Sequence, residues 1–228
     1  MTQLRPVAEN IWLLTYPLRL AGLQIGRNVT VIRVRDGRLL IHSTAPFAAQ
    51  DVAAISALGE PAWLVDASLF HDSFAKEGRK NFPDLPYLAP QGFTKAGGVL
   101  TTPLDPPPVA WAGEIDVLPL LGARAHEHVF YHRPSRTLIV CDLLFNFGPN
   151  ASPWTRWFAR HLMRLPDGIG MSAFFRLTIG DRAAFQQSLR QMMDWPFDRI
   201  IVGHGDIIEA NAKQIALDHF TRAGFQIT

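Results

Sequence analysis

The chain has 228 residues, 48% of them hydrophobic, so it can bury one substantial core without disulfides. Basic residues exceed acidic ones by only 22 to 20, which lacks the strong positive excess of nucleic-acid-binding proteins. The single cysteine, Cys141, excludes an internal disulfide framework and a cysteine-rich zinc ribbon. Any metal site would therefore depend on histidine and carboxylate side chains.

The first residues, MTQLRPVAEN, contain no apolar run of the kind that a secretory signal needs. No window of the chain approaches the roughly 18 to 20 apolar residues of a membrane span. We expect a soluble, cytoplasmic protein that forms one domain over residues 1–228.

The first 45 residues have the pattern of a β-meander, with Asp36-Gly37 between two apolar runs as a hairpin turn. The spacing of Val52, Ile55 and Leu58 predicts a helix next. Further strands are predicted at 62–67, 86–90, 114–121, 128–132, 137–145 and 199–206. Further helices are predicted at 73–82, 152–165, 181–194 and from about Glu209 onward. This alternation of strands and helices favours an α/β sandwich.

Polar groups that can bind metals fall at the ends of several predicted strands. His71 and Asp72 follow the strand at 62–67. Asp142 is the last residue of TLIVCD, and His204 is the middle residue of GHG. Glu127, in the triplet HEH, precedes another strand. Strand ends meet at a sheet edge, and imidazole with carboxylate suits Zn, Fe or Mn.

Each of these residues also has a simpler interpretation. His71 and Asp72 could cap a helix, because aspartate favours helix starts. Asp142 could belong to a structural salt bridge, since a carboxylate in an apolar run needs a partner. His204, between two glycines, could be a turn residue at a close backbone approach.

The helix predicted at 152–165 is amphipathic. Its apolar face carries Trp154, Trp157, Phe158, Leu162 and Leu165, and its opposite face carries Arg156, Arg160 and Arg164. Such a helix either lies on a membrane surface or covers a core or pocket. The second interpretation is favoured, so membrane association is not expected.

The order of these features resembles the metallo-β-lactamase-like fold, and the chain is similar to the bacterial family DUF4336. The resemblance extends from about Ile11 to Ile208. It rests on the stretches NVTVIRVRDGRLLIHST, AWLVDASLFHDSF, HEHVFYHRPSRTLIVCDLLFN and IIVGHG. It implies a four-layer αββα sandwich.

The family's first metal site is missing from this sequence. The family's HxHxDH motif, which contributes to both metal sites, falls on Asp66, Ser68, Phe70 and His71, so only its last histidine is present. A further first-site histidine falls near Arg124 and is absent too.

His71, Asp142 and His204 correspond to positions of the family's second site. Asp142 matches the aspartate that bridges two metals in the family, and His204 matches the last histidine. The resemblance therefore implies one divalent ion, Zn, Fe or Mn, held by His71, Asp142 and His204.

The activity that this implies is hydrolysis of a small-molecule ester, thioester or lactone. Asp72 or Glu127 is expected to carry the proton, and Asp72, Asp66 or Glu127 could add a fourth ligand. The alternative is a scaffold or binding protein that has lost the metal site. No G-x-S-x-G, G-x-G-x-x-G or Walker sequence occurs, which disfavours serine hydrolysis and nucleotide binding by those motifs.

Overall fold

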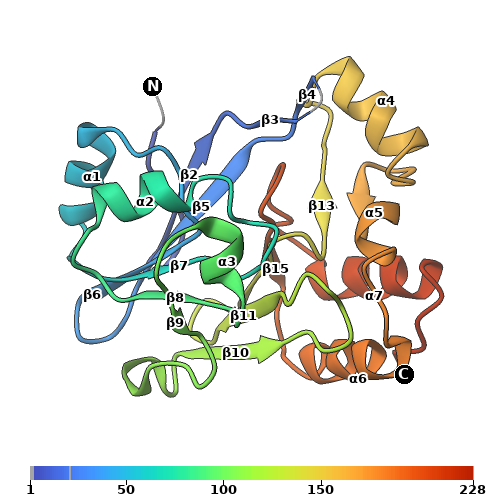
Figure 1. The fold of residues 1–228 in the computed structure, drawn as a ribbon. Helices are drawn as coiled ribbons and strands as arrows, with labels where there is room; N and C mark the ends of the chain where they lie inside the picture. The colour runs from blue at the N-terminus through green and yellow to red at the C-terminus, as the bar shows by residue number, and fades with distance from the viewer. Residues whose placement is uncertain (1–2, 21, 228) are drawn as a thin grey trace.

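Two β-sheets pack face to face, with helices on both outer faces, as the computed structural model of residues 3–20 and 22–227 shows (Figure 1). The order across the first sheet is β1 (Arg5–Ala8), β2 (Ile11–Tyr16), β5 (Arg27–Arg33), β6 (Arg38–His42), β7 (Glu60–Val65), β8 (Tyr87–Ala89) and β9 (Thr102–Pro103). The order across the second sheet is β10 (Ile115–Pro119), β11 (His128–His132), β12 (Thr137–Ile139) and β15 (Arg199–Ile201). Two short hairpins complete the strands: β3 (Arg19–Leu20) with β4 (Leu23–Gln24), and β13 (Phe145–Asn146) with β14 (Ile169–Gly170).

Three apolar layers hold the sandwich together. Side chains between the sheets, among them Ile32, Trp63 and Phe130, form the middle layer. The outer face of the first sheet packs against α1 (Ala49–Ser56), α2 (Ala75–Asn81) and α3 (Phe93–Gly97). The outer face of the second sheet packs against α6 (Arg182–Met193) and α7 (Ala212–Arg222). In Figure 1, α1 and α2 lie on one side of the molecule and α6 and α7 on the other. The αββα sandwich implied by the sequence is confirmed.

Three further helices lie within the described residues. They are the 3₁₀ turn η1 (Val109–Trp111), α4 (Pro153–His161) and α5 (Ala173–Arg176). The predicted helix at 152–165 ends earlier than expected, at His161. Its apolar side is divided: Phe158 lines a pocket, whereas Trp154 and Trp157 are 48% exposed and stack on each other.

Parallel pairing sets the position of the site. β12 and β15 run parallel, with Ile139 opposite Ile201, so the segments that follow them emerge at the same sheet edge. In the first sheet β6, β7 and β8 are also parallel, and the chain after β7 emerges at one end of that sheet.

One local prediction was wrong. The strand expected at 137–145 ends at Ile139, because the backbone N–H groups of Cys141 and Asp142 bind the Glu127 side chain instead of a neighbouring strand. In the triplet HEH, Glu127 precedes β11, as the sequence predicted.

Within the described ranges, no helix combines the length and apolar character needed to cross a bilayer.

Candidate metal centre

Three side chains from three strand ends converge at one point. His71 lies in the loop between β7 and α2, Asp142 in the turn between β12 and β13, and His204 just after β15. One ligand atom from each lies within 4.8 Å of the others. The structure therefore brings together the three residues that the sequence predicted as metal ligands.

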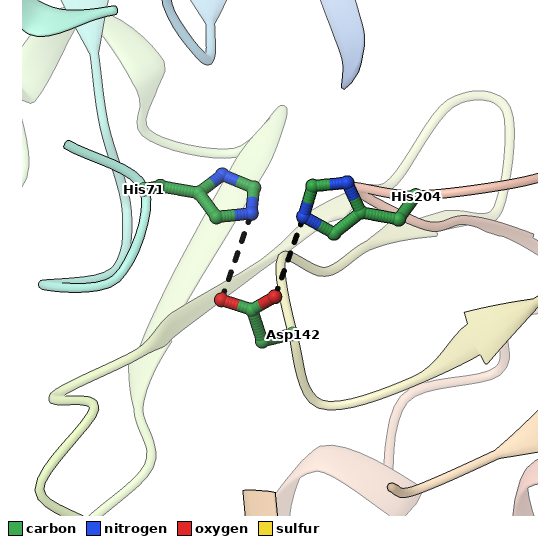
Figure 2. Close-up of side chains that lie close together, drawn as sticks. All are labelled: His71, Asp142 and His204. Atoms are coloured by element: carbon green, nitrogen blue, oxygen red, sulfur yellow. Dashed lines mark ion pairs between the residues drawn. The ribbon is translucent and has the colours of Figure 1, made fainter. Parts of the chain in front are cut away.

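The spacing of the donor atoms fits a single ion. The Asp142 carboxylate lies between the two imidazoles, with Oδ2 3.7 Å from His71 Nε2 and Oδ1 3.4 Å from His204 Nε2 (Figure 2). Two donors on a tetrahedral zinc ion with bonds of about 2.0 to 2.1 Å are separated by about 3.3 Å. Only small side-chain movements separate this arrangement from coordination.

The hydrogen bond of His204 fixes its tautomer. Its Nδ1 lies 2.5 Å from the carbonyl oxygen of Gly26, which can only accept, so Nδ1 carries the proton. Its other ring nitrogen, Nε2, faces Asp142. Phe145 stacks on the ring, with centroids 5.6 Å apart, and holds it in place. His204 is thus oriented as a metal-binding histidine usually is, with a carbonyl behind the ligating ring.

His71 is fully buried and also suited to binding a cation. Burial, together with the positive charge of Arg27, lowers the pKa of His71 well below its ordinary value, so the imidazole is neutral. Among the described residues, neither its Nε2 nor Oδ2 of Asp142 has a hydrogen-bond partner, although both atoms are buried. Buried polar atoms are rarely left unpaired, so this pair is consistent with binding an ion.

Gly203 leaves the space that His71 needs. A Cβ at this position would lie 2.7 Å from His71 Cε1 and 2.7 Å from the carbonyl oxygen of Cys141. Any other residue would push the imidazole away from Asp142. The close backbone approach predicted for GHG is confirmed here.

Glu127 lies behind Asp142. It is fully buried, and its carboxylate oxygens accept the backbone N–H groups of Cys141 at 2.7 Å and Asp142 at 2.9 Å. Burial and the negative charge of Asp142 raise the pKa of Glu127. The contacts place Glu127 where it shapes the turn that presents Asp142. Its predicted role as proton carrier stays a prediction.

Asp72 lies next to His71 but outside the cluster. Its side chain is partly buried, and its backbone carbonyl accepts the N–H of Ala75 at the start of α2. It is not among the residues that line the neighbouring pocket. Its predicted role as proton carrier or fourth ligand also stays a prediction.

At the first-site positions, hydrogen bonds within the protein occupy the side chains. Asp66 is buried and accepts the backbone N–H of Thr44 at 3.0 Å, the Thr44 hydroxyl at 2.7 Å and the Tyr87 hydroxyl. Ser68 accepts the N–H of Phe70 at 3.2 Å. These contacts make Asp66 and Ser68, which the resemblance matches to first-site ligands, part of the hydrogen-bonded core.

Asp66 gives the fold a pH dependence. Burial raises its pKa from 3.8 to about 6, although Arg27 and three hydrogen bonds oppose the rise. Its stabilising contribution is therefore complete below about pH 4 and is lost as the pH rises through about 6. Relative to Asp66→Asn, the wild type should gain about 2 kcal/mol of unfolding free energy between about pH 7.5 and about pH 4.5. Urea denaturation at both pH values measures this, and parallel pH profiles for the two proteins would contradict it.

A pocket of about 430 Å³ opens beside the cluster, lined in part by Asp142 and His204. Its walls are mostly apolar and come from the β3–β4 hairpin, from β13, and from α4, α5 and the chain between them. They include Leu23, Phe145, Phe158, Met163 and Phe175. A substrate in this pocket would place an apolar group against the walls and a reacting group at Asp142 and His204.

Sequence reasoning missed two residues of this region, Arg27 and Asn28. The Asn28 amide donates to the carbonyls of Val202 and Gly205, both at 2.8 Å, and so holds the loop that carries His204. Arg27 is buried and lines the pocket. The available signal was the polar pair RN at the head of the apolar run VTVIRV, where a buried strand starts.

Comparison with known proteins agrees with this architecture. No protein-family model matches the chain, and no curated protein matches it. Three similar solved structures illustrate the fold. A metallo-β-lactamase from Erythrobacter litoralis has 16% identity and a TM-score of 0.67, with 96% of each chain covered. The DIM-1 metallo-β-lactamase has 16% identity and a TM-score of 0.63, with 97% of each chain covered. A metallo-β-lactamase from Pontibacter korlensis has 11% identity and a TM-score of 0.62, covering 97% of this chain and 99% of that one. The protein described here therefore has the metallo-β-lactamase fold.

Proposed function

We propose that this protein is a metal-dependent hydrolase with one divalent ion, acting on an ester, thioester or lactone. The observation that carries the proposal is the convergence of His71, Asp142 and His204 beside an apolar pocket. The finer resemblance to DUF4336 stays a prediction, because the structural comparisons support the fold alone.

The donor set fits a catalytic metal. Two imidazoles and one carboxylate provide three ligands, which leaves a tetrahedral ion one open position. Zn, Fe and Mn all accept this combination. A bound ion of this kind would polarise a substrate carbonyl and lower the pKa of a water molecule.

The residues of the chain would perform the remaining tasks. His204 and His71 hold their Nε2 atoms toward Asp142. Glu127 fixes the backbone from which Asp142 projects. The apolar pocket excludes water from the bound substrate and positions its carbonyl next to the cluster.

Metal analysis combined with a hydrolysis assay tests the proposal. Protein purified without chelator should contain about one equivalent of Zn, Fe or Mn, and it should hydrolyse members of a panel of aryl esters, acyl thioesters and lactones. A strong chelator should abolish hydrolysis, and readdition of the ion should restore it. Less than about a tenth of an equivalent after metal addition, with no hydrolysis across the panel, would favour a scaffold without chemistry.

A further inference from the structure

Arg27, the first residue of β5, is a buried cation. Only 1% of its surface is exposed, and its Nε and Nη1 atoms are buried and have no hydrogen-bond partner among the described residues. By contrast, Arg79, which is only partly buried, is well satisfied. The Arg79 guanidinium donates to the carbonyls of Phe82, Pro83 and Leu85. A guanidinium has five N–H donors and stays charged, so leaving it unpaired in the interior is costly.

The guanidinium lies at the pocket beside the candidate metal centre. Arg27 lines this pocket together with Asp142 and His204, and its Cζ lies 5.9 Å from the centroid of the Phe74 ring. Its charge reaches the surrounding groups, because it lowers the pKa values of His42, His71 and Asp66. Arg27 therefore brings a permanent positive charge to a region from which the first metal site has been lost.

The nearby carboxylates do not pair with Arg27. Asp66 accepts hydrogen bonds from Thr44 and Tyr87, and the Asp142 carboxylate faces His71 and His204. Neither carboxylate forms an ion pair with Arg27 in the described structure. Nε and Nη1 of Arg27 thus lack a partner among the described residues, and because both atoms are buried, a molecule in the pocket can reach them only if side chains at its wall move.

The other pocket walls limit what that molecule can be. Ser73 and Ser172 are the only hydroxyl-bearing residues among those that line it, and most of the remaining lining residues are apolar. A planar guanidinium matches a carboxylate through two parallel hydrogen bonds. One guanidinium offers one positive charge, which a carboxylate balances and a dianionic phosphate exceeds.

We propose that Arg27 binds the carboxylate of a substrate whose remaining body is apolar. The proposal deepens the hydrolase function proposed above and rests on it for the reaction. The substrate class would be an ester, thioester or lactone that carries a free carboxylate on an apolar acyl group. Arg27 would hold the carboxylate and the pocket walls the apolar group, with the carbonyl presented to the cluster.

Binding of octanoate and octanamide, measured by calorimetry, tests Arg27 without any catalytic step. The two probes share an apolar chain and differ in charge. Wild-type protein should bind octanoate at least about tenfold more tightly than octanamide, as expected for hydrogen bonds to a charged group. Arg27→Met should remove this preference and leave octanamide binding unchanged, whereas Arg27→Lys should retain part of it. A thermal melt of each variant shows whether it is folded.

Two further binding measurements distinguish the role of Arg27 from the proposed metal site. The preference for octanoate should persist after chelator treatment and in Asp142→Asn. A preference that disappears with the metal would assign the carboxylate to the ion and overturn the role of Arg27, with the hydrolase proposal intact. Equal binding of the two probes by the wild type would overturn it directly. If the protein binds no metal but still prefers octanoate, the hydrolase proposal would be overturned and the proposed role of Arg27 in carboxylate binding would be supported.

Discussion

Asp142→Asn should release the metal and abolish hydrolysis. Asparagine keeps the shape of the side chain and one carbonyl oxygen, but it removes the negative charge that lies between His71 and His204. Loss of an outer partner of a metal ligand costs about 10- to 100-fold in affinity, so loss of a ligand charge should cost more than about 100-fold. Metal content per protein and the rate of hydrolysis, compared under the same conditions, measure the effect.

The matched control is Asp84→Asn, which makes the same chemical change at an exposed aspartate in the turn before β8. This variant should retain the metal and the wild-type rate. If Asp142→Asn kept a full equivalent of metal, His71 and His204 would have to hold the ion with other partners, and the proposed centre would be wrong.

Glu127→Gln should cost about 2 to 3 kcal/mol of unfolding free energy. One oxygen of the Glu127 side chain becomes an NH₂ group that faces the backbone N–H of Cys141 or Asp142, so a hydrogen bond is replaced by two opposed donors. Since Glu127 is fully buried, water cannot easily compensate. Chemical denaturation of the two proteins gives the difference.

Glu77→Gln, at an exposed position in the first turn of α2, is the control and should lie within about 0.5 kcal/mol of the wild type. The pair of variants also distinguishes two roles for Glu127. If Glu127 is a proton carrier, as the sequence suggested, Glu127→Gln should lose activity while its unfolding free energy stays as close to the wild-type value as that of Glu77→Gln. A decrease of about 2 to 3 kcal/mol in the unfolding free energy would instead identify Glu127 as a structural support for Asp142.

The sequence predicted the architecture well where the pattern has a simple physical origin. Strands with alternating or continuous apolar residues and helices with periodic apolar residues appear near their expected places, as at β7 and α6. Because β12 and β15 are parallel neighbours, Asp142 and His204 emerge at one sheet edge, whereas His71 follows a strand of the other sheet and was added to them by the resemblance to a known family. Their meeting point follows from topology more than from local sequence.

Other features depend on contacts between distant residues and could not be predicted. The run TLIVCDLLF has a continuous strand pattern, and only the Glu127 carboxylate explains why the chain turns at Cys141. Similarly, Arg27 resembles an ordinary residue at a strand start, and its burial depends on how the two sheets pack. Sequence periodicity contains no information on which polar side chains lose their partners in the folded state.

The attachment of residues 202–205 to Gly26 and Asn28 has a consequence for how the protein folds. These hydrogen bonds join residues 174 to 178 positions apart, so the geometry around His204 cannot exist until the start of β5 has met the segment that follows β15. Contacts of such long sequence separation form late, because much chain entropy is lost before they contribute. An ion at this centre would bind only the completed fold and would stabilise both ends of the chain together by mass action. Occupancy of the centre would thus report that folding is complete.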